Sequence, residues 1–470
     1  MTKILIGPVT RENTPMAVEV SLGNKVISDA KIMGRHMRGF EYMLVGLAPT
    51  DAPYFTERIC GICSTAHTYA SCLALEDATR HDLTKNGVLI RNIIFAGDLL
   101  QNHLRHFYLL SVPDYVHLAA EPPWTPRYVF RDRLAKDVTK RITANYFKAF
   151  EISREAHTLS ANFGGRTPHT WSIQPGGATV QPTAEKIMRA LANLRVVKEF
   201  VTGAYREDLL TLVEAFPEYA EYGSRPRNYL SFGLLRDPDN PPEPLLPGGV
   251  LLEGQKEKVD VASISESIRH AWYSASKDVE EDPFYHAPPE PDRKKAGAYS
   301  FIKAARYKGK ACEGGPIARA YLNGGYQGGN ATWDRHLARQ WEAEVTIELM
   351  ERWINQLQEN QPSYSQWETP DSGKGEGLFD AMRGPLGHWV EIAGGKIKHY
   401  TIVTPSVWNM GPRVDAENLS PLEEALVGTP IEDVENPVEI GRVVRAFDPC
   451  TACAVHVLTP TRKLEPFRIV

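Results

Sequence analysis

The chain reads Thr-Glu-Arg-Ile-Cys-Gly-Ile-Cys-Ser-Thr-Ala-His at residues 56–67 and Asp-Pro-Cys-Thr-Ala-Cys-Ala-Val-His at residues 448–456. Each stretch contains a Cys-x-x-Cys pair, whose turn brings two sulfurs to one side where both can bind one metal. Pairs this far apart are not those of a zinc finger or ribbon. A site built from both pairs would close the two ends of the fold around one centre. Four thiolates suit zinc, nickel or iron–sulfur, and spacing alone gives zinc about half the weight.

Composition excludes several classes of protein. The 470 residues are 42% hydrophobic and 24% charged, which is typical of globular chains and excludes wholesale disorder. The net charge of −5 gives no electrostatic reason to expect nucleic acid as a partner. No apolar run is long enough to span a membrane, and the N-terminus does not resemble a signal peptide. Six cysteines are too few for a disulfide scaffold, and the isolated Cys72 and Cys312 are expected to be buried apolar side chains.

Periodicity predicts a mostly helical chain with small β elements near its ends. Alternating residues at 17–22 and 26–33 indicate a hairpin, and residues 396–403 resemble a strand. A second apolar run spans residues 438–447, and proline-rich loops are expected at 223–250 and 282–296. Amphipathic spacing predicts helices over residues 64–84, 86–112, 133–163, 183–216 and 333–360. The fold class is therefore α+β, predominantly α-helical, with the cysteine pairs outside the long helices.

Three further segments accompany the cysteine pairs. They are Arg38-Gly39-Phe40-Glu41, then Met382-Arg383-Gly384-Pro385-Leu386-Gly387-His388-Trp389, then Thr404-Pro405-Ser406-Val407-Trp408-Asn409. In this order they resemble the large subunit of nickel–iron hydrogenases over nearly the whole chain, from Gly7 to the tail. The resemblance implies an oxidoreductase that cleaves or forms molecular hydrogen heterolytically at a nickel–iron centre and passes electrons to an iron–sulfur small subunit.

The resemblance also implies a ligand set. Nickel would be bound by Cys60, Cys63, Cys450 and Cys453. Cys63 and Cys453, the second of each pair, would bridge to an iron that carries cyanide and carbon monoxide, in an Ni–Fe(CN)2(CO) centre. Thiolates are soft, strong donors that suit both metals. A terminal thiolate, on Cys60 or Cys450, or the guanidinium of Arg383 would be the base that receives the proton.

Further residues around the centre match family positions. His67, one helical turn after Cys63, would hydrogen-bond a bridging sulfur, and Asp448 would hold Arg383 through a charge-assisted bond. Pro405 and Ser406 would contact the cyanides. A magnesium or similar ion would be bound by Glu41, His456 and the backbone carbonyl of Ile402.

Three departures from the family pattern concern the proton path and the wall of the site. Asn13 occupies the place of a glutamate that passes protons, with Glu12 one residue away, Met382 replaces a proline and Asn102 an aspartate. An amide cannot relay a proton as a carboxylate does. Either a one-residue slip brings Glu12 into the gap, or protons leave through His67 or through Arg383 and Asp448. The second route is favoured, because an extended segment would direct Glu12 away from Asn13.

The resemblance implies a division of a single catalytic subunit. Its parts are a β-rich segment at 1–62, a helical bundle at 63–220, a loop-rich insertion at 221–332, a long helix at 333–360, a metal-site part at 361–456 and a cleavable tail at 457–470. A maturation endopeptidase would cut after His456. The iron–sulfur small subunit is an obligate partner, because Cys72 and Cys312 cannot hold a cluster. A twin-arginine signal on that partner would make the complex periplasmic or membrane-associated; otherwise it stays cytoplasmic.

Three other functions are compatible with parts of this pattern. A hydrogen-sensing regulatory protein of the same fold usually lacks a cleavable tail, which this chain has. The quinone-reducing relative in respiratory complex I has lost the cysteines that this chain keeps. A plain four-thiolate zinc protein is distinguished by metal analysis.

Overall fold

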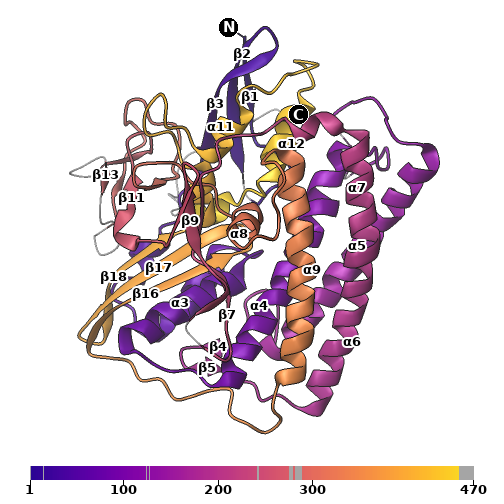
Figure 1. Ribbon diagram of the computed structural model, residues 1–470. Coiled ribbons are helices and arrows are strands. Elements are labelled where there is room, and N and C mark those ends of the chain that lie inside the picture. Colours follow the sequence, from indigo (N-terminus) through magenta and orange to yellow (C-terminus); the bar gives the residue numbers. More distant parts are fainter. Residues whose placement is uncertain are drawn as a thin grey trace.

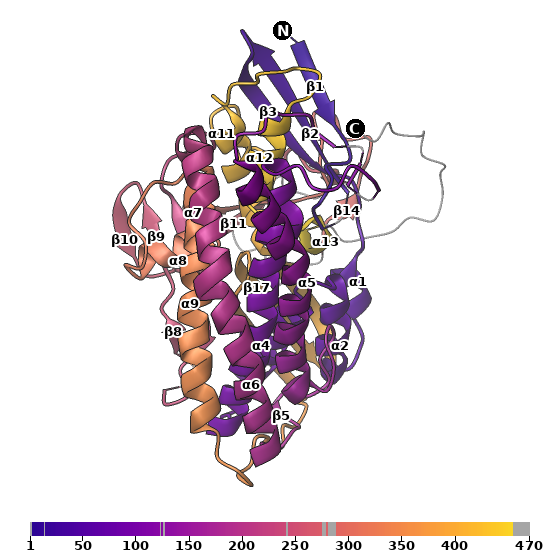
Figure 2. The same ribbon diagram turned by 90° about the vertical axis from the view of Figure 1, so that its right-hand side faces the viewer.

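The structure is a computed structural model that describes residues 2–13, 15–122, 124–125, 127–240, 243–274, 279–280 and 288–454. Helices α5, α6, α7 and α9 line one flank of the molecule, and the sheet β16–β18 lies on the other (Figure 1). Seen from the helical flank, the N-terminal sheet stands above the helices (Figure 2). The α+β, predominantly helical fold class is confirmed.

All five expected helices are present, with corrected boundaries. The helix expected at 183–216 is divided by a π-helical segment, Val201–Tyr205. The helix expected at 86–112 ends in another π-helical segment, His106–Ser111. The principal helices are α3 (Ser64–Thr79), α4 (Lys85–Arg105), α5 (Lys136–Gly164), α6 (Ala184–Phe200), α7 (Arg206–Ala215) and α9 (Thr332–Gln356). The shorter helices are α1 (Phe40–Leu44), α2 (Ala52–Thr56), α8 (Pro316–Leu322), α10 (Pro405–Met410), α11 (Pro421–Leu426), α12 (Val438–Ala446) and α13 (Thr451–Ala454).

Two three-stranded antiparallel sheets are formed by parts of the chain near its two ends. The expected hairpin is β2 (Met16–Gly23) and β3 (Val26–Gly34), to which β1 (Thr2–Ile6) adds an edge strand. The expected strand at 396–403 is β18 (Lys396–Val403), and it pairs with β17 (Gly384–Ala393), which pairs with β16 (Ser372–Ala381). Periodicity missed β16 and β17, because glycine stands at every second position at the start of β16 and conceals the alternation of a strand.

Four short strands, β6 to β9, interrupt the loop expected at 223–250, and further short strands lie outside it. They pair in small antiparallel sheets beside the larger ones. Their bounds are β4 (Ile173–Gln174), β5 (Gly177–Ala178), β6 (Tyr229–Ser231), β7 (Leu234–Arg236), β8 (Pro244–Leu246), β9 (Gly249–Leu252), β10 (Gln255–Glu257), β11 (Ile264–Ser267), β12 (Tyr273–Ser274), β13 (Val279–Glu280), β14 (Glu290–Pro291) and β15 (Ala304–Tyr307).

Helix α3 lies directly on β16 because the glycines of β16 permit a very close approach. A Cβ atom on Gly375 would lie 2.1 Å from the carbonyl oxygen of Ala74, and one on Gly377 would lie 2.0 Å from that of Ala70. Any side chain at these two positions would push the helix off the sheet. This contact joins the helix that follows the first cysteine pair to the strand that leads to Arg383.

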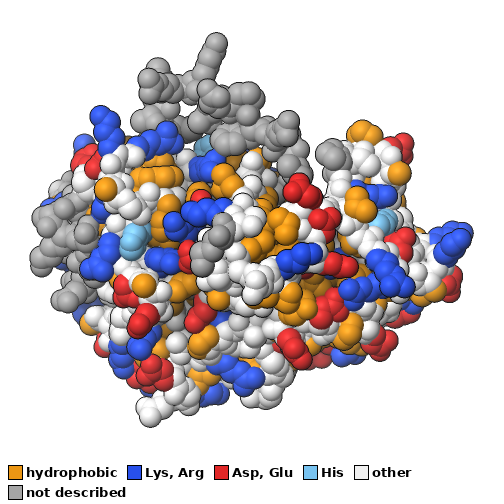
Figure 3. Space-filling view, turned by 90° about the horizontal axis from the view of Figure 1, so that it is seen from above, with side chains coloured by type: hydrophobic (Ala, Val, Ile, Leu, Met, Phe, Trp, Pro, Cys, Tyr) orange, Lys and Arg blue, Asp and Glu red, His pale blue; other side chains and the backbone are white. Residues whose placement is uncertain are grey.

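In the part of the chain that the structure describes, no helix is both long and apolar enough to cross a membrane. The face seen from above carries basic, acidic and hydrophobic side chains in mixture (Figure 3). Cys72 and Cys312 are buried apolar residues of the core, as expected.

Candidate metal centre

The first cysteine pair lies in a tight turn that α3 continues. Cys60 follows a short 3-10 turn at Glu57–Ile59, and Cys63 directly precedes the first residue of α3. Arg38 holds this turn by donating hydrogen bonds to the carbonyl oxygens of Ile59 and Arg58. Both cysteines are buried, and Cys60 Sγ accepts a hydrogen bond from the backbone of Ile62 at 3.3 Å.

The second pair is brought to the same place by the segment after α12. Residue 450 forms an isolated parallel bridge with Asn13, and Thr451 N donates to the carbonyl oxygen of Asn13 at 3.1 Å. The backbone of Cys450 also donates to Ser406 Oγ at 3.2 Å. Ser406 lies with Pro405 in the first turn of α10, and a hydroxyl that accepts one bond can still donate another.

Three sulfurs from the two ends of the chain converge. The Sγ atoms of Cys60, Cys63 and Cys450 all lie within 4.8 Å of one another, and those of Cys60 and Cys450 are 3.5 Å apart. The side chain of Cys453, on α13, lies outside the described residues. Buried thiols so arranged fit a soft metal, to which they bind as thiolates.

Arg383 lies over this cluster at the turn between β16 and β17. Its Nε donates to the carbonyl oxygen of Asp448 at 2.9 Å, and its Nη2 lies 3.1 Å from Asp448 Oδ1 and 2.8 Å from Asn102 Oδ1. Its Nη1 is buried and has no hydrogen-bond partner among the described residues. Burial alone would lower the pKa of Arg383, but Asp448 and the three thiols raise it well above the usual value. The guanidinium is therefore a fixed cation with one donor nitrogen that no described residue uses.

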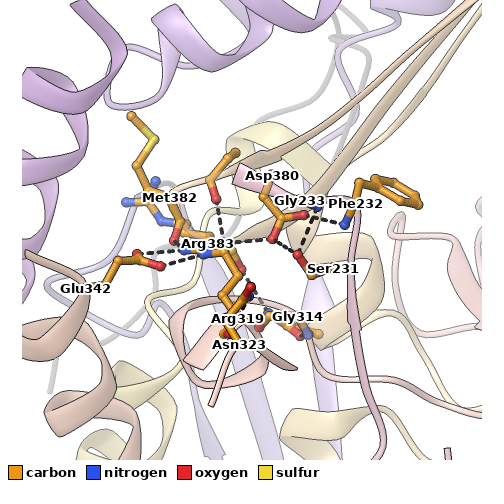
Figure 4. Close-up of polar contacts among 12 residues, drawn as sticks. Ser231, Phe232, Gly233, Gly314, Arg319, Asn323, Glu342, Asp380, Met382 and Arg383 are labelled. Carbon is orange, nitrogen blue, oxygen red and sulfur yellow. Dashed lines mark hydrogen bonds and ion pairs between the residues drawn. The ribbon is translucent and has the colours of Figure 1, made fainter. Parts of the chain in front are cut away.

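A second arginine fixes the backbone on which Arg383 stands (Figure 4). Arg319, on α8, donates to the carbonyl oxygens of Ala381 at 3.1 Å and Met382 at 3.0 Å. Its guanidinium is paired with Glu342 on α9 at 2.5 Å and Asp380 on β16 at 2.9 Å. All of these side chains are buried, so the network orders the turn before Arg383. Nothing in the sequence pattern signals this contact.

The ring of His67 belongs to a buried chain of polar groups. Its Nδ1 lies 3.1 Å from His388 Nε2, and His388 Nδ1 lies 2.8 Å from the hydroxyl of Tyr400, which donates to Ser71 Oγ at 2.9 Å. Burial lowers the pKa of His67 to about 4, so the imidazole is neutral at physiological pH. The sequence alone gives no sign that His388 is the partner of His67, because the two residues are 321 positions apart.

Of the three expected magnesium ligands, Glu41 and Ile402 lie within the described residues. Glu41 Oε1 accepts a hydrogen bond from Ile402 N at 2.9 Å, while His456 lies outside the described residues. Lys303, which the sequence did not single out, lies 3.8 Å from Glu41 Oε1 and forms an ion pair with Glu266. Burial would lower the pKa of Lys303, but Glu266 and Glu41 raise it, so a cation already lies beside this carboxylate.

The segment at residues 11–13 is not extended, which corrects the argument about Glu12. Arg11 has a φ of 56°, and the half-buried Glu12 side chain lies close enough to Cys450 for the two charges to interact. Its Oε1 accepts a hydrogen bond from Met16 N at 3.0 Å, and its Oε2 has no partner in the described part of the chain. Burial raises the pKa of Glu12 to about 9, with a further contribution from Cys450. Asn13 faces the sulfurs, with Nδ2 3.0 Å from Cys60 Sγ and 3.1 Å from Cys450 Sγ.

Comparison with known proteins agrees with this geometry. The family model for nickel-dependent hydrogenases matches residues 38–127, 122–331 and 322–456. The large subunit of the periplasmic [NiFeSe] hydrogenase of Desulfomicrobium baculatum is 37% identical, over 97% of this chain and 95% of that one. The quinone-reactive Ni/Fe-hydrogenase large chain of Wolinella succinogenes is 30% identical, over 100% and 98%.

A solved structure agrees in fold as well. The reduced Ni-Fe-Se hydrogenase of D. vulgaris Hildenborough superposes with a TM-score of 0.93 at 34% identity, covering 97% of this chain and 100% of that chain. Two of these relatives are named for selenium, whereas the present sequence has sulfur at all four candidate ligand positions. The chain therefore belongs to the nickel-dependent hydrogenases, as a large, catalytic subunit that oxidises or produces molecular hydrogen.

Proposed function

We propose that Cys60, Cys63, Cys450 and Cys453 hold the nickel, with Cys63 and Cys453 shared with an iron that carries cyanide and carbon monoxide. When bound, this centre supplies the heterolytic splitting of hydrogen. The observation that supports this most directly is the convergence of three buried sulfurs near Arg383, whose Nη1 has no hydrogen-bond partner in the part of the chain that the structure describes. A fixed cation with a free donor can bind and orient small anionic ligands and stabilise charge that develops at the open side of the centre.

The metal content tests this assignment. The mature protein should contain about one nickel and one additional iron per chain, with cyanide and carbon monoxide bands in the infrared spectrum. Cys63→Ser should abolish assembly, because a hydroxyl is a poor substitute for a bridging thiolate. Cys72→Ser, at a buried cysteine outside the cluster, is the matched control and should retain both metals. Stoichiometric zinc without those bands would contradict the proposal.

We further propose that the partner is an iron–sulfur small subunit and that it binds beside the first cysteine pair. Exposed hydrophobic side chains gather there: Tyr54 and Phe55 on α2 and Trp171, whose indole is 59% exposed and lies under Arg166. Gln174 links Tyr54 to Trp171, because its side-chain amide donates to the hydroxyl of Tyr54 and to the carbonyl oxygen of Trp171. A permanent complex of this kind buries above about 2,000 Å².

Co-purification tests this surface. The double variant Tyr54→Glu and Trp171→Glu should lose the small subunit, because two charges would be buried in an apolar contact. Met188→Glu changes a still more exposed hydrophobic residue on α6, outside the patch, and should keep the partner. If the double variant retained the small subunit, the interface would have to lie on another face of the protein.

The remaining assignments concern the ion near the C-terminus, the tail and the compartment. Glu41, the Ile402 carbonyl and His456 are proposed to bind magnesium, which should be measurable beside nickel. A peptidase is proposed to cut after His456, so the mass of the mature chain should lack residues 457–470. The compartment is set by the partner, and a twin-arginine signal on the small subunit would make it periplasmic.

A further inference from the structure

One amide group contacts two sulfurs that belong to different ends of the chain. Asn13 Nδ2 lies 3.0 Å from Cys60 Sγ and 3.1 Å from Cys450 Sγ. These cysteines are the first members of the two pairs, the positions proposed as terminal nickel ligands. The contact therefore concerns the two sulfurs that are not shared with iron.

Backbone hydrogen bonds hold this amide in place. Asn13 is bridged to Cys450, and its carbonyl oxygen accepts hydrogen bonds from Thr451 N at 3.1 Å and Thr451 Oγ1 at 3.3 Å. Three residues earlier, Arg445 Nη1 donates to the carbonyl oxygen of Thr10 at 2.9 Å. The asparagine side chain is short, so a fixed backbone leaves its amide little freedom to turn away.

Chemistry determines which end of the amide faces the sulfurs. A metal-bound thiolate has no proton and can only accept hydrogen bonds, whereas the amide nitrogen carries two hydrogens. One hydrogen is available for each sulfur. The carbonyl end of the amide would repel both thiolates, so the nitrogen end is held toward them.

Hydrogen bonds to a thiolate draw electron density away from sulfur. They weaken it as a donor to the metal and thereby tune the metal's reduction potential, as hydrogen bonds to cluster sulfurs do in iron–sulfur proteins. An amide does not titrate between pH 4 and 10, so Asn13 exerts this effect without taking part in proton transfer.

We propose that Asn13 is a positioning residue that clamps the two terminal nickel thiolates, Cys60 and Cys450, with one N–H···S hydrogen bond to each and lowers the electron density of the metal centre. The inference rests on the proposed nickel–iron assignment. It gives the asparagine an electronic role at a position where the family resemblance places an acid that moves protons.

Infrared and potentiometric measurements on the holoenzyme with its small subunit test the clamp. Asn13→Ala should shift the carbon monoxide band to lower wavenumber and the nickel midpoint potential to a more negative value, because both sulfurs regain electron density. Transfer of the wild type to D2O should displace the band slightly, and this isotope shift should become smaller in the variant, in which the backbone of Ile62 still donates to Cys60. Asn355→Ala, which removes an exposed amide on α9, should change neither quantity.

A second variant keeps the test decisive when Asn13→Ala loads metal poorly. The hydroxyl of Asn13→Ser can donate one hydrogen bond, so its band and potential should lie between those of the wild type and the alanine variant. Wild-type values in either metal-loaded variant would overturn the clamp. Absence of nickel and of the infrared bands from the wild type would instead overturn the metal assignment, so the two failures are distinguishable.

Discussion

At the scale of single residues, the site combines groups whose charge is fixed with one group whose charge can change. Arg383 is held cationic by Asp448 and the thiols, and His67 is held neutral by burial. Asn13 does not titrate. Glu12 differs from all three, because burial raises its pKa to about 9 and leaves Oε2 without a partner among the described residues. Near neutral pH a carboxyl with this pKa holds its proton, so Glu12 would relay protons by donating its own and then taking up another.

Glu12→Gln tests whether this carboxyl replaces the missing relay. Turnover should fall on the order of a hundredfold or more, because a positioned acid or base contributes about that much. Nickel and iron content should be unchanged, since Glu12 is not a proposed ligand. Glu185→Gln, an exposed glutamate on α6, serves as control. A fall in turnover of less than about threefold would indicate that the proton leaves through His67, or through Arg383 and Asp448. In that case the turnover of Asn13→Glu should equal or exceed that of the wild type.

Asp98, on α4, gives a prediction about pH and stability. Burial raises its pKa to about 6, although hydrogen bonds from Thr65 and Gln101 oppose the shift. The folded state therefore binds a proton more tightly than the unfolded state does. Stability should fall as pH rises from about 4 to about 6 and stay lower above that range, by up to about 3 kcal/mol. Asp98→Asn, which stays neutral, should lack this part of the fall in thermal unfolding midpoints recorded from pH 4 to 8; parallel profiles would show that the carboxyl titrates normally.

At the scale of elements, the metal centre depends on how closely α3 packs on β16. The helix follows Cys63 and the strand leads to Arg383, so their separation sets the distance between thiols and guanidinium. Arg319 on α8 and Glu342 on α9 then fix the turn between β16 and β17. Four elements that carry no proposed metal ligand thus determine the position of one catalytic side chain.

Gly377→Ala should disturb this packing. The added Cβ would meet the carbonyl oxygen of Ala70 at 2.0 Å, so the helix must move or the strand must bend. Overpacking of this kind costs about 1–3 kcal/mol and commonly more against backbone. Gly23→Ala, at the end of β2, meets nothing within 4 Å and should change stability by less than about 0.5 kcal/mol. Equal midpoints of thermal unfolding for the two variants would show that the helix can shift freely.

At the scale of the whole molecule, what could be predicted from sequence followed from local patterns. Helical periodicity located the five helices, and the spacing of Cys60, Cys63, Cys450 and Cys453 indicated a site joining both ends of the chain. Contacts between distant segments left no such pattern. The hydrogen bonds of Arg319 depend on where α8 lies, and the direction of Glu12 depends on a bend at Arg11 that the extended-strand argument did not include.

The parallel bridge between Asn13 and Cys450 has a consequence for the order of events during biosynthesis. The ribosome makes residue 450 long after residue 13, and a segment still inside the exit tunnel cannot pair with the folded N-terminal part. The cluster of sulfurs is therefore incomplete until the segment around Cys450 has left the ribosome. A site that needs both ends of the chain cannot form before then, so each newly made chain first exists with these sulfurs apart.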